Sequence, residues 1–196
     1  MEKLFRPKNY KWNLKGLEKC IKENELKSRI VAVDKTNTKA IVHVTSYHDS
    51  VILGATSSWC ISQHDCSWGQ YVSSKGNTQI FVFNFVLSPM SDELSLVGAT
   101  FKKDGELFCA FTRENHPLAE ITKCENDSFA LFDIVIYPHF GNEIDEVLSE
   151  LISGKRPKGY VNDNLVEEQL VTTTSPRVFD FGGYLGDYYY IYDDIF

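Results

Sequence analysis

The side chains that could do chemistry gather between residues 53 and 71, in the sequence LGATSSWCISQHDCSWGQY. Cys60 and Cys66 are candidate nucleophiles, and His64 between them is a candidate base. A cysteine with an ordinary pKa of about 8.5 attacks at neutral pH only when an imidazolium or a helix N-terminus stabilises its thiolate. The segment therefore allows a first hypothesis, a cysteine-dependent hydrolase or transferase in which Cys60 attacks and His64 takes up the proton.

The same three side chains allow a second hypothesis, a zinc site. Cys60, His64 and Cys66 offer ligand types that zinc accepts, and Cys109, His116 or Cys124 could supply a fourth. The spacing differs from the usual pairs of ligands two or three residues apart. No glycine-rich phosphate loop of standard spacing occurs either. We therefore expect no cofactor, with zinc kept as an alternative.

A third hypothesis gives this segment a structural or binding role. Trp59 and Ile61 would alternate inward on an extended stretch, with Cys60 as a small space-filling residue. Trp68 and Tyr71 are three residues apart, as on one face of a helix. Large rigid rings beside a few polar groups are also typical of a binding pocket, so Trp59, Trp68 and Tyr71 are candidate binding residues.

The order of residues in this segment resembles a group of uncharacterised proteins of tailed phages. The resemblance rests on Gly54-x-x-Ser57-x-Trp59-Cys60-Ile61, followed by Trp68 and Tyr71, a glycine turn and an aromatic strand. The group carries Gly-x-x-Thr-x-Trp-Cys with Thr or Ile next, so Ser57 replaces the usual threonine. The likeness covers residues 49–111 approximately. It implies a viral origin and transfers no catalytic roles, since the group has no established activity.

The C-terminal residues 176–196 form a second unusual segment, rich in aromatic and acidic side chains. Glycines at 182, 183 and 186 oppose a helix, so we expect an extended arm. Such aromatic density argues for docking rather than disorder. The arm could complete its own sheet, bind a partner, or mimic a nucleic acid. Its candidate binding residues are Tyr184, Tyr188, Tyr189, Tyr190, Tyr192 and Phe196.

The first half of the chain must position these groups with one helix and three strands. Asn13 is a good N-cap for a helix over 14–27, and two β-rich runs at 30–33 and 40–44 predict a hairpin. Ser46 could cap a helical turn that ends at Gly54. Residues 78–87, TQIFVFNFVL, are apolar on both faces and predict a central strand covered on two sides.

The second half of the chain predicts three further strands and a set of helices. Strands over 94–101 and 106–111 flank Asp104-Gly105, a dipeptide that tolerates φ > 0 at both positions of a hairpin turn. The run FALFDIVIY at 129–137 predicts another strand. Short helices are expected after His116-Pro117 and over 163–171. The clearest helix covers 144–152, capped by Asn142 and closed by Gly154.

Charge and composition restrict the class of protein. The chain has 196 residues and a net charge of −7, with the first 35 residues basic and the rest acidic. The negative charge opposes nucleic-acid binding. No apolar run is long enough for a transmembrane helix, and the charged N-terminus lacks a signal peptide. Five scattered cysteines favour reduced thiols in a cytoplasm, that of a host cell if the protein is viral.

These observations predict an α+β domain over 1–175 with the arm 176–196 attached. The fold would be a central, mostly antiparallel sheet of five to six strands, with helices from both ends of the chain packed against it. The leading function is a non-enzymatic, phage-encoded interaction protein of the host-takeover or anti-defence type, which binds a host or viral protein or a second copy of itself. The alternatives are the Cys60 enzyme and a structural component of the virion.

Overall fold

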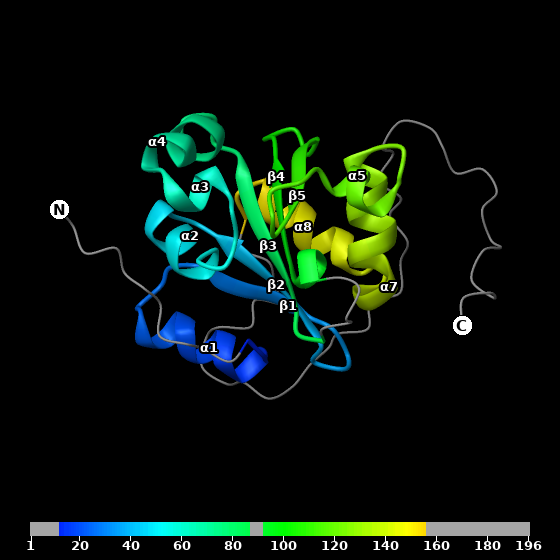
Figure 1. The fold of residues 1–196 in the computed structure, drawn as a ribbon, viewed down its shortest axis with the longest axis horizontal. Helices are drawn as coiled ribbons and strands as arrows, with labels where there is room; N and C mark the ends of the chain where they lie inside the picture. The colour runs from blue at the N-terminus through cyan, green and yellow to red at the C-terminus, as the bar shows by residue number, and fades with distance from the viewer. Residues whose placement is uncertain (1–11, 87–91, 156–196) are drawn as a thin grey trace.

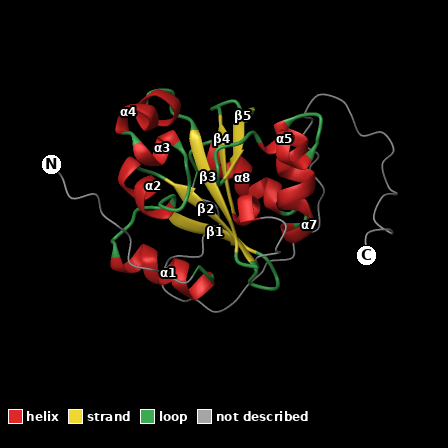
Figure 2. Ribbon diagram, in the orientation of Figure 1, coloured by secondary structure: helices red, strands yellow, loops and turns green. Residues whose placement is uncertain are grey.

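The fold is a single antiparallel sheet between two groups of helices (Figures 1 and 2). The computed structural model describes residues 12–86 and 92–155. The arm 176–196, the helix expected over 163–171 and the domain boundary at 175 lie outside the described residues. The α+β class and the five-stranded sheet confirm the prediction made from the sequence. None of the helices in the described part has the length and apolar content that crossing a bilayer requires.

The sheet follows the chain as a simple meander, in which each strand pairs with the next in antiparallel orientation. β3 is central, and its alternating side chains enter two separate cores, as expected from its two apolar faces. Phe81 and Phe83 lie in the first core, and Ile80 and Val82 lie in the second. The strands are β1 (Arg29–Val33), β2 (Lys39–Val44), β3 (Thr78–Asn84), β4 (Leu96–Phe101) and β5 (Leu107–Thr112).

The first face of the sheet is covered by the helices of the N-terminal half, on the left in Figure 1. They are α1 (Leu14–Glu23), α2 (Tyr47–Leu53), α3 (Cys60–Gln63), α4 (Asp65–Trp68) and the π-helical turn η1 (Gly69–Ser73). Asn13 caps α1 and Ser46 caps α2 through their side chains, as predicted. α1 ends four residues earlier than predicted because Glu25 takes a left-handed conformation with φ 51°. Cys20 is fully buried in this layer.

The second face is covered by elements that follow β3 and β5. They are η2 (Asp92–Ser95), α5 (Leu118–Thr122), α6 (Asp127–Phe129), η3 (Ala130–Ile136), α7 (Tyr137–Phe140) and α8 (Ile144–Ile152). α8 matches its predicted range, and Gly154 closes it with φ 74°. Its N-cap is Glu143, and the Asn142 side chain does not cap it, so the predicted cap is wrong.

The strand predicted over 129–137 is wrong, because these residues are helical in α6, η3 and α7. The Asn126 side chain starts the turn by accepting a hydrogen bond from the Phe129 N–H at 2.8 Å. Burial then follows helical spacing, with Leu131, Phe132, Val135 and Ile136 against the sheet. The β-branched and aromatic residue types favour a strand locally. Burial of only one side of this segment against the sheet stabilises a helix instead.

The β4–β5 hairpin is present, but its turn differs from the predicted one. Only Gly105 has a positive φ, 93°, while Asp104 does not. The Gly105 N–H donates to the Lys102 carbonyl at 3.0 Å, so the turn contains more residues than a two-residue loop. The free edge of β5 is partly protected, because the Thr112 N–H donates to the His116 carbonyl at 2.9 Å. The Asp127 carboxylate also accepts from the Ala110 N–H at 3.4 Å.

Candidate functional site

A tight connection between α2 and α3 directs Trp59 into the protein. α2 ends at Gly54, whose carbonyl accepts a hydrogen bond from the Ser57 hydroxyl at 2.7 Å. A Cβ at Gly54 would lie 2.3 Å from the Ser62 Oγ, so only glycine allows α2 and α3 to approach this closely. The spacing Gly54-x-x-Ser57-x-Trp59 is therefore explained by the local backbone.

Trp59 holds this connection onto three strands of the sheet. Its side chain is 3% exposed, and its indole Nε1 donates to the Thr112 carbonyl of β5 at 2.6 Å. The ring lies on Gly98 of β4, where a Cβ would be 3.0 Å from two of its carbons. It also packs on Phe81 of β3, with ring centroids 4.6 Å apart. Trp59 is therefore a core residue, as the structural hypothesis predicts.

The other two predicted binding residues of the segment lie nearby but not in a common pocket. Trp68 is buried in the first core. Tyr71 is half-buried, and its ring centroid lies 6.4 Å from that of Phe108 on β5. The three aromatic side chains thus support the packing of α3, α4 and η1 on the sheet rather than line a site for a small molecule.

Cys60 is exposed, which contradicts the expectation that it fills space. Trp59 is the N-cap of α3, with φ −73° and ψ 131°, and the helix begins at Cys60. The alternation expected of an extended segment therefore stops at Trp59, and the next side chain points to solvent. Cys66 is exposed as well.

The structure does not join Cys60 to a base. The main-chain N–H of His64 donates to the Cys60 carbonyl at 2.8 Å, but the described residues give the Cys60 thiol no hydrogen bond to an imidazole. His48, His64 and His139 are exposed, while His43 is partly buried. The pKa of His43 and that of His139 are lowered, mainly by desolvation.

The zinc hypothesis gains no support from the geometry. Within residues 12–86 and 92–155, no three His, Cys, Asp or Glu side chains are grouped so that they could hold a metal ion. Cys60, His64 and Cys66 are therefore not gathered as a ligand set.

A row of polar side chains crosses the sheet on the face of the first core. Gln79, Thr100 and Cys109 are cross-strand neighbours on β3, β4 and β5. The Thr100 hydroxyl donates to the Gln79 side-chain oxygen at 2.5 Å and also hydrogen-bonds with the Cys109 thiol. The pKa of Cys109 is raised, chiefly by burial and to a smaller extent by the negative charge of Asp127. From the sequence, Cys109 was expected only as a possible fourth zinc ligand, because the cross-strand register that forms this row is not visible in the spacing of the residues.

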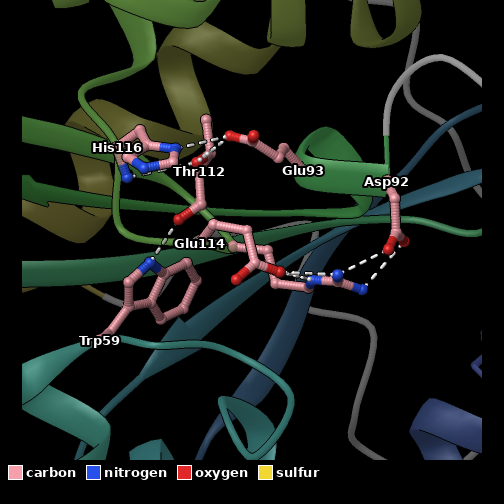
Figure 3. Close-up of polar contacts among 7 residues, drawn as sticks. Trp59, Asp92, Glu93, Thr112, Glu114 and His116 are labelled. Atoms are coloured by element: carbon pink, nitrogen blue, oxygen red, sulfur yellow. Dashed lines mark hydrogen bonds and ion pairs between the residues drawn. The ribbon is translucent and has the colours of Figure 1, made fainter.

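A second polar cluster lies at the far end of β5, and Figure 3 shows its members. The carboxylate of Glu93 in η2 lies 3.0 Å from the His116 Nδ1. It also accepts a hydrogen bond from the Thr112 hydroxyl at 3.1 Å. The β4–β5 pairing opposes Val97 to Thr112, which brings these groups together. The predicted hairpin already pairs the two strands, but the sequence did not indicate that the residues just outside them, Glu93 and His116, would form a hydrogen bond.

Arg113 extends the cluster on the other side of β5. Its guanidinium makes two hydrogen bonds to the Asp92 carboxylate, at 2.9 and 2.6 Å, and two to the Glu114 carboxylate, at 3.1 and 2.7 Å. The Arg113 carbonyl accepts from the Ser58 N–H at 2.9 Å, next to Trp59. The cluster therefore fastens both η2 and the α2–α3 connection to the end of β5.

The electrostatics of the cluster are those of a salt link. The hydrogen bond between the two side chains lowers the pKa of Glu93 and raises that of His116. Both groups are solvent-accessible, so the effect on stability is small. In the described part of the chain, neither a cysteine thiol nor a serine hydroxyl is hydrogen-bonded to the His116 ring. The pair therefore has the form of a base and its orienting acid without a nucleophile.

Three large apolar side chains are exposed on β5 and on the two helices that contact it. Phe108 on β5, Ile121 on α5 and Phe129 on α6 are 39%, 36% and 49% exposed. A groove of about 250 Å³ runs between β5 and α6, lined by Phe108, Leu107, Glu106 and residues 126–128. We call Phe108, Ile121 and Phe129 the apolar edge. Large exposed apolar groups of this kind mark interaction surfaces in soluble proteins.

The arm residues Tyr184, Tyr188, Tyr189, Tyr190, Tyr192 and Phe196 lie outside the described residues. Comparison with known proteins adds no relative: no family model matches the chain, and neither a curated protein nor a solved structure matches it.

Proposed function

We propose that this chain is a non-enzymatic protein-binding module and that the apolar edge is its contact surface. One observation carries the proposal: Phe108 stays exposed in the lining of a groove and Phe129 stays exposed one residue after that lining, although the described residues bury most of their other large apolar side chains in two cores. Protein interfaces are enriched in aromatic side chains at their centres. The two rings would enter the centre of the contact, and the groove would take up a side chain of the partner.

The charge around the apolar edge defines the chemistry of the partner. Residues 106–129 contain five carboxylates and two cationic side chains. Glu106 and Asp127 belong to the groove lining itself. A partner that presents an apolar side chain next to lysine or arginine would therefore match both the rings and the charge.

The source that we propose is a tailed phage, and the partner is a host or viral protein. The resemblance over residues 49–111 supports this source. The composition of the arm 176–196 supports a second contact with the same partner, and a chain that ends at residue 175 tests that contribution.

A second candidate function is the cysteine-dependent hydrolase or transferase. The exposure of Cys60 favours it. The lack of a neighbouring imidazole among the described residues weighs against it. Full biological activity of Cys60→Ala would exclude the enzyme hypothesis.

The proposed contact can be tested by placing a photo-crosslinking amino acid at residue 129 in the full chain. The matched control is residue 86, since Val86 is also an exposed apolar residue, 57% exposed, at the end of β3. We expect one protein to crosslink from position 129 and not from 86. Crosslinking only to a second copy of the chain, or equally from both positions, would overturn the proposed surface.

A further inference from the structure

A pocket of about 190 Å³ lies between α8 and the turn of the β4–β5 hairpin, and its described lining shares no residue with the groove beside Phe108. One wall is apolar and consists of Phe101 of β4, Phe132 of η3, and Leu148 and Ile152 of α8. The two rings lie with their centroids 6.1 Å apart and are inclined by 58°. Both rings and Leu148 are buried in the second core, so close packing fixes this wall in place.

A carboxylate completes the lining beside the apolar wall. Asp145 lies in the first turn of α8 and is half-buried. Its Oδ1 accepts a hydrogen bond from the Tyr137 hydroxyl at 3.0 Å. The Tyr137 ring packs on Phe132, with centroids 5.5 Å apart, so the same side chain contacts the wall and orients the carboxylate. Among the described residues, no cationic side chain is ion-paired with Asp145.

The charges at the mouth of the pocket leave the place beside Asp145 open to a cation. Lys103 and Asp104 are exposed and belong to the lining at the hairpin turn. The Lys103 side chain extends over Gly76, where a Cβ would lie 3.0 Å from its Nζ, and Gly76 is not part of the lining. Burial raises the pKa of Asp145, because the carboxylate has lost part of its hydration. A bound cation would replace that hydration and favour the charged form.

We propose that this pocket binds a small primary amine that carries one apolar ring, with the ring against Phe101, Phe132 and Leu148 and the ammonium group on the Asp145 carboxylate. The size of the pocket sets the size of the ligand. An apolar cavity of about 150 Å³ holds one benzene ring, so 190 Å³ accommodates a single ring with a short aminoalkyl group. The inference does not depend on the protein-binding function proposed above, because it concerns a different surface.

The arrangement should select an amine over a neutral molecule of the same shape. The ammonium group would donate a charge-assisted hydrogen bond to Asp145, which is stronger than a bond between neutral groups. The aromatic rings of the wall would add attraction for the positive charge. A neutral alcohol with the same ring would keep the apolar contacts and lose both of these terms.

The test is an NMR titration of the full chain at pH 7 with benzylamine and, separately, with benzyl alcohol, following the methyl groups of Leu148 and Ile152. We expect benzylamine to shift both residues with a Kd on the order of 1 mM, as for a ligand of this size. Benzyl alcohol should bind about tenfold more weakly or less. Leu17 in the first core is the internal reference, and its methyl groups should not shift.

Two variants assign the selectivity to the carboxylate. Asp145→Asn keeps the shape of the side chain and removes its charge, so it should bind benzylamine as weakly as benzyl alcohol. Glu146→Gln is the matched control, because Glu146 is the next carboxylate along α8 but is exposed and lies outside the lining. It should keep the affinity and the selectivity of the wild type.

The wild-type chain alone can contradict the proposal, so the result does not depend on how the variants fold. Equal affinities for benzylamine and benzyl alcohol would overturn it. So would a titration in which Leu148 and Ile152 stay unchanged at amine concentrations well above 1 mM, on the order of the expected Kd, or in which the shifts gather at the groove beside Phe108 instead.

Discussion

The Trp59 indole donates a 2.6 Å hydrogen bond to the Thr112 carbonyl, although the two residues are 53 positions apart. The hydroxyl of the same Thr112 donates to Glu93, which binds His116. One residue at the end of β5 thus connects the Trp–Cys segment on one side with the Glu93–His116 pair on the other (Figure 3). The indole N–H gives Trp59 a role that another large apolar side chain could not fill.

Replacing Trp59 by phenylalanine should remove this bond and leave the Thr112 carbonyl without its buried donor. A buried acceptor without a partner costs about 1–3 kcal/mol. Trp68→Phe is the control, since Trp68 is also buried but has no indole hydrogen bond to another described residue. In urea denaturation, Trp59→Phe should lower the free energy of unfolding more than Trp68→Phe does. Equal losses would show that the bond contributes nothing.

Gly98 should not tolerate alanine, because the new methyl group would lie 3.0 Å from two carbons of the Trp59 ring. Overpacking of this kind costs about 1–3 kcal/mol. Gly69→Ala is the control, since a Cβ there meets nothing within 4 Å and the backbone is helical. In the Trp59→Phe background the cost of Gly98→Ala should shrink, because the smaller ring leaves room. An unchanged cost would place the strain elsewhere.

The Glu93–His116 pair should make stability depend on pH in two directions. The pKa of His116 is raised above its ordinary 6.5, so its contribution is complete below pH 6.5 and is lost as the pH rises through the folded-state pKa. The pKa of Glu93 is lowered below 4.5, so its contribution is complete above pH 4.5 and is lost as the pH falls through the lowered value. The pair therefore stabilises the fold most between pH 4.5 and 6.5.

This pH dependence can be measured by NMR titration of the His116 ring. We expect its pKa above 6.5 in the wild type and a return toward 6.5 in Glu93→Gln, which keeps the shape of the side chain but not its charge. An unchanged His116 pKa in that variant would contradict the pairing. The free energy of unfolding of His116→Gln should vary less between pH 6.5 and 8 than that of the wild type.

The fold could be predicted well where a signal was local and supported by burial on one or both faces. The two-sided apolar pattern of 78–87 predicted a central strand, and the caps at Asn13 and Ser46 predicted two helix starts. The prediction for residues 129–137 was wrong because residue types that favour strands occupy a segment whose buried positions follow the spacing of a helix. Residue propensity is a local property, and contact with the sheet decided against it.

The site could be predicted only in part, because its contacts join distant residues. The Trp–Cys segment was recognised, but whether Cys60 faces inward depends on where α3 begins, and that is set by the position of Trp59 on the sheet. The position of Cys109 beside Thr100 and the exposure of Phe129 both follow from packing between elements. No spacing in the sequence indicates either.

The most direct measurement is the affinity of the partner crosslinked at residue 129 for three purified chains: wild type, Phe129→Ser and Val86→Ser. The apolar edge predicts that Phe129→Ser weakens binding by about tenfold or more in calorimetry, as expected for an aromatic side chain at the centre of an interface. Val86→Ser should bind like the wild type. Equal affinities for Phe129→Ser and the wild type, with both chains folded, would contradict the proposed function of this surface.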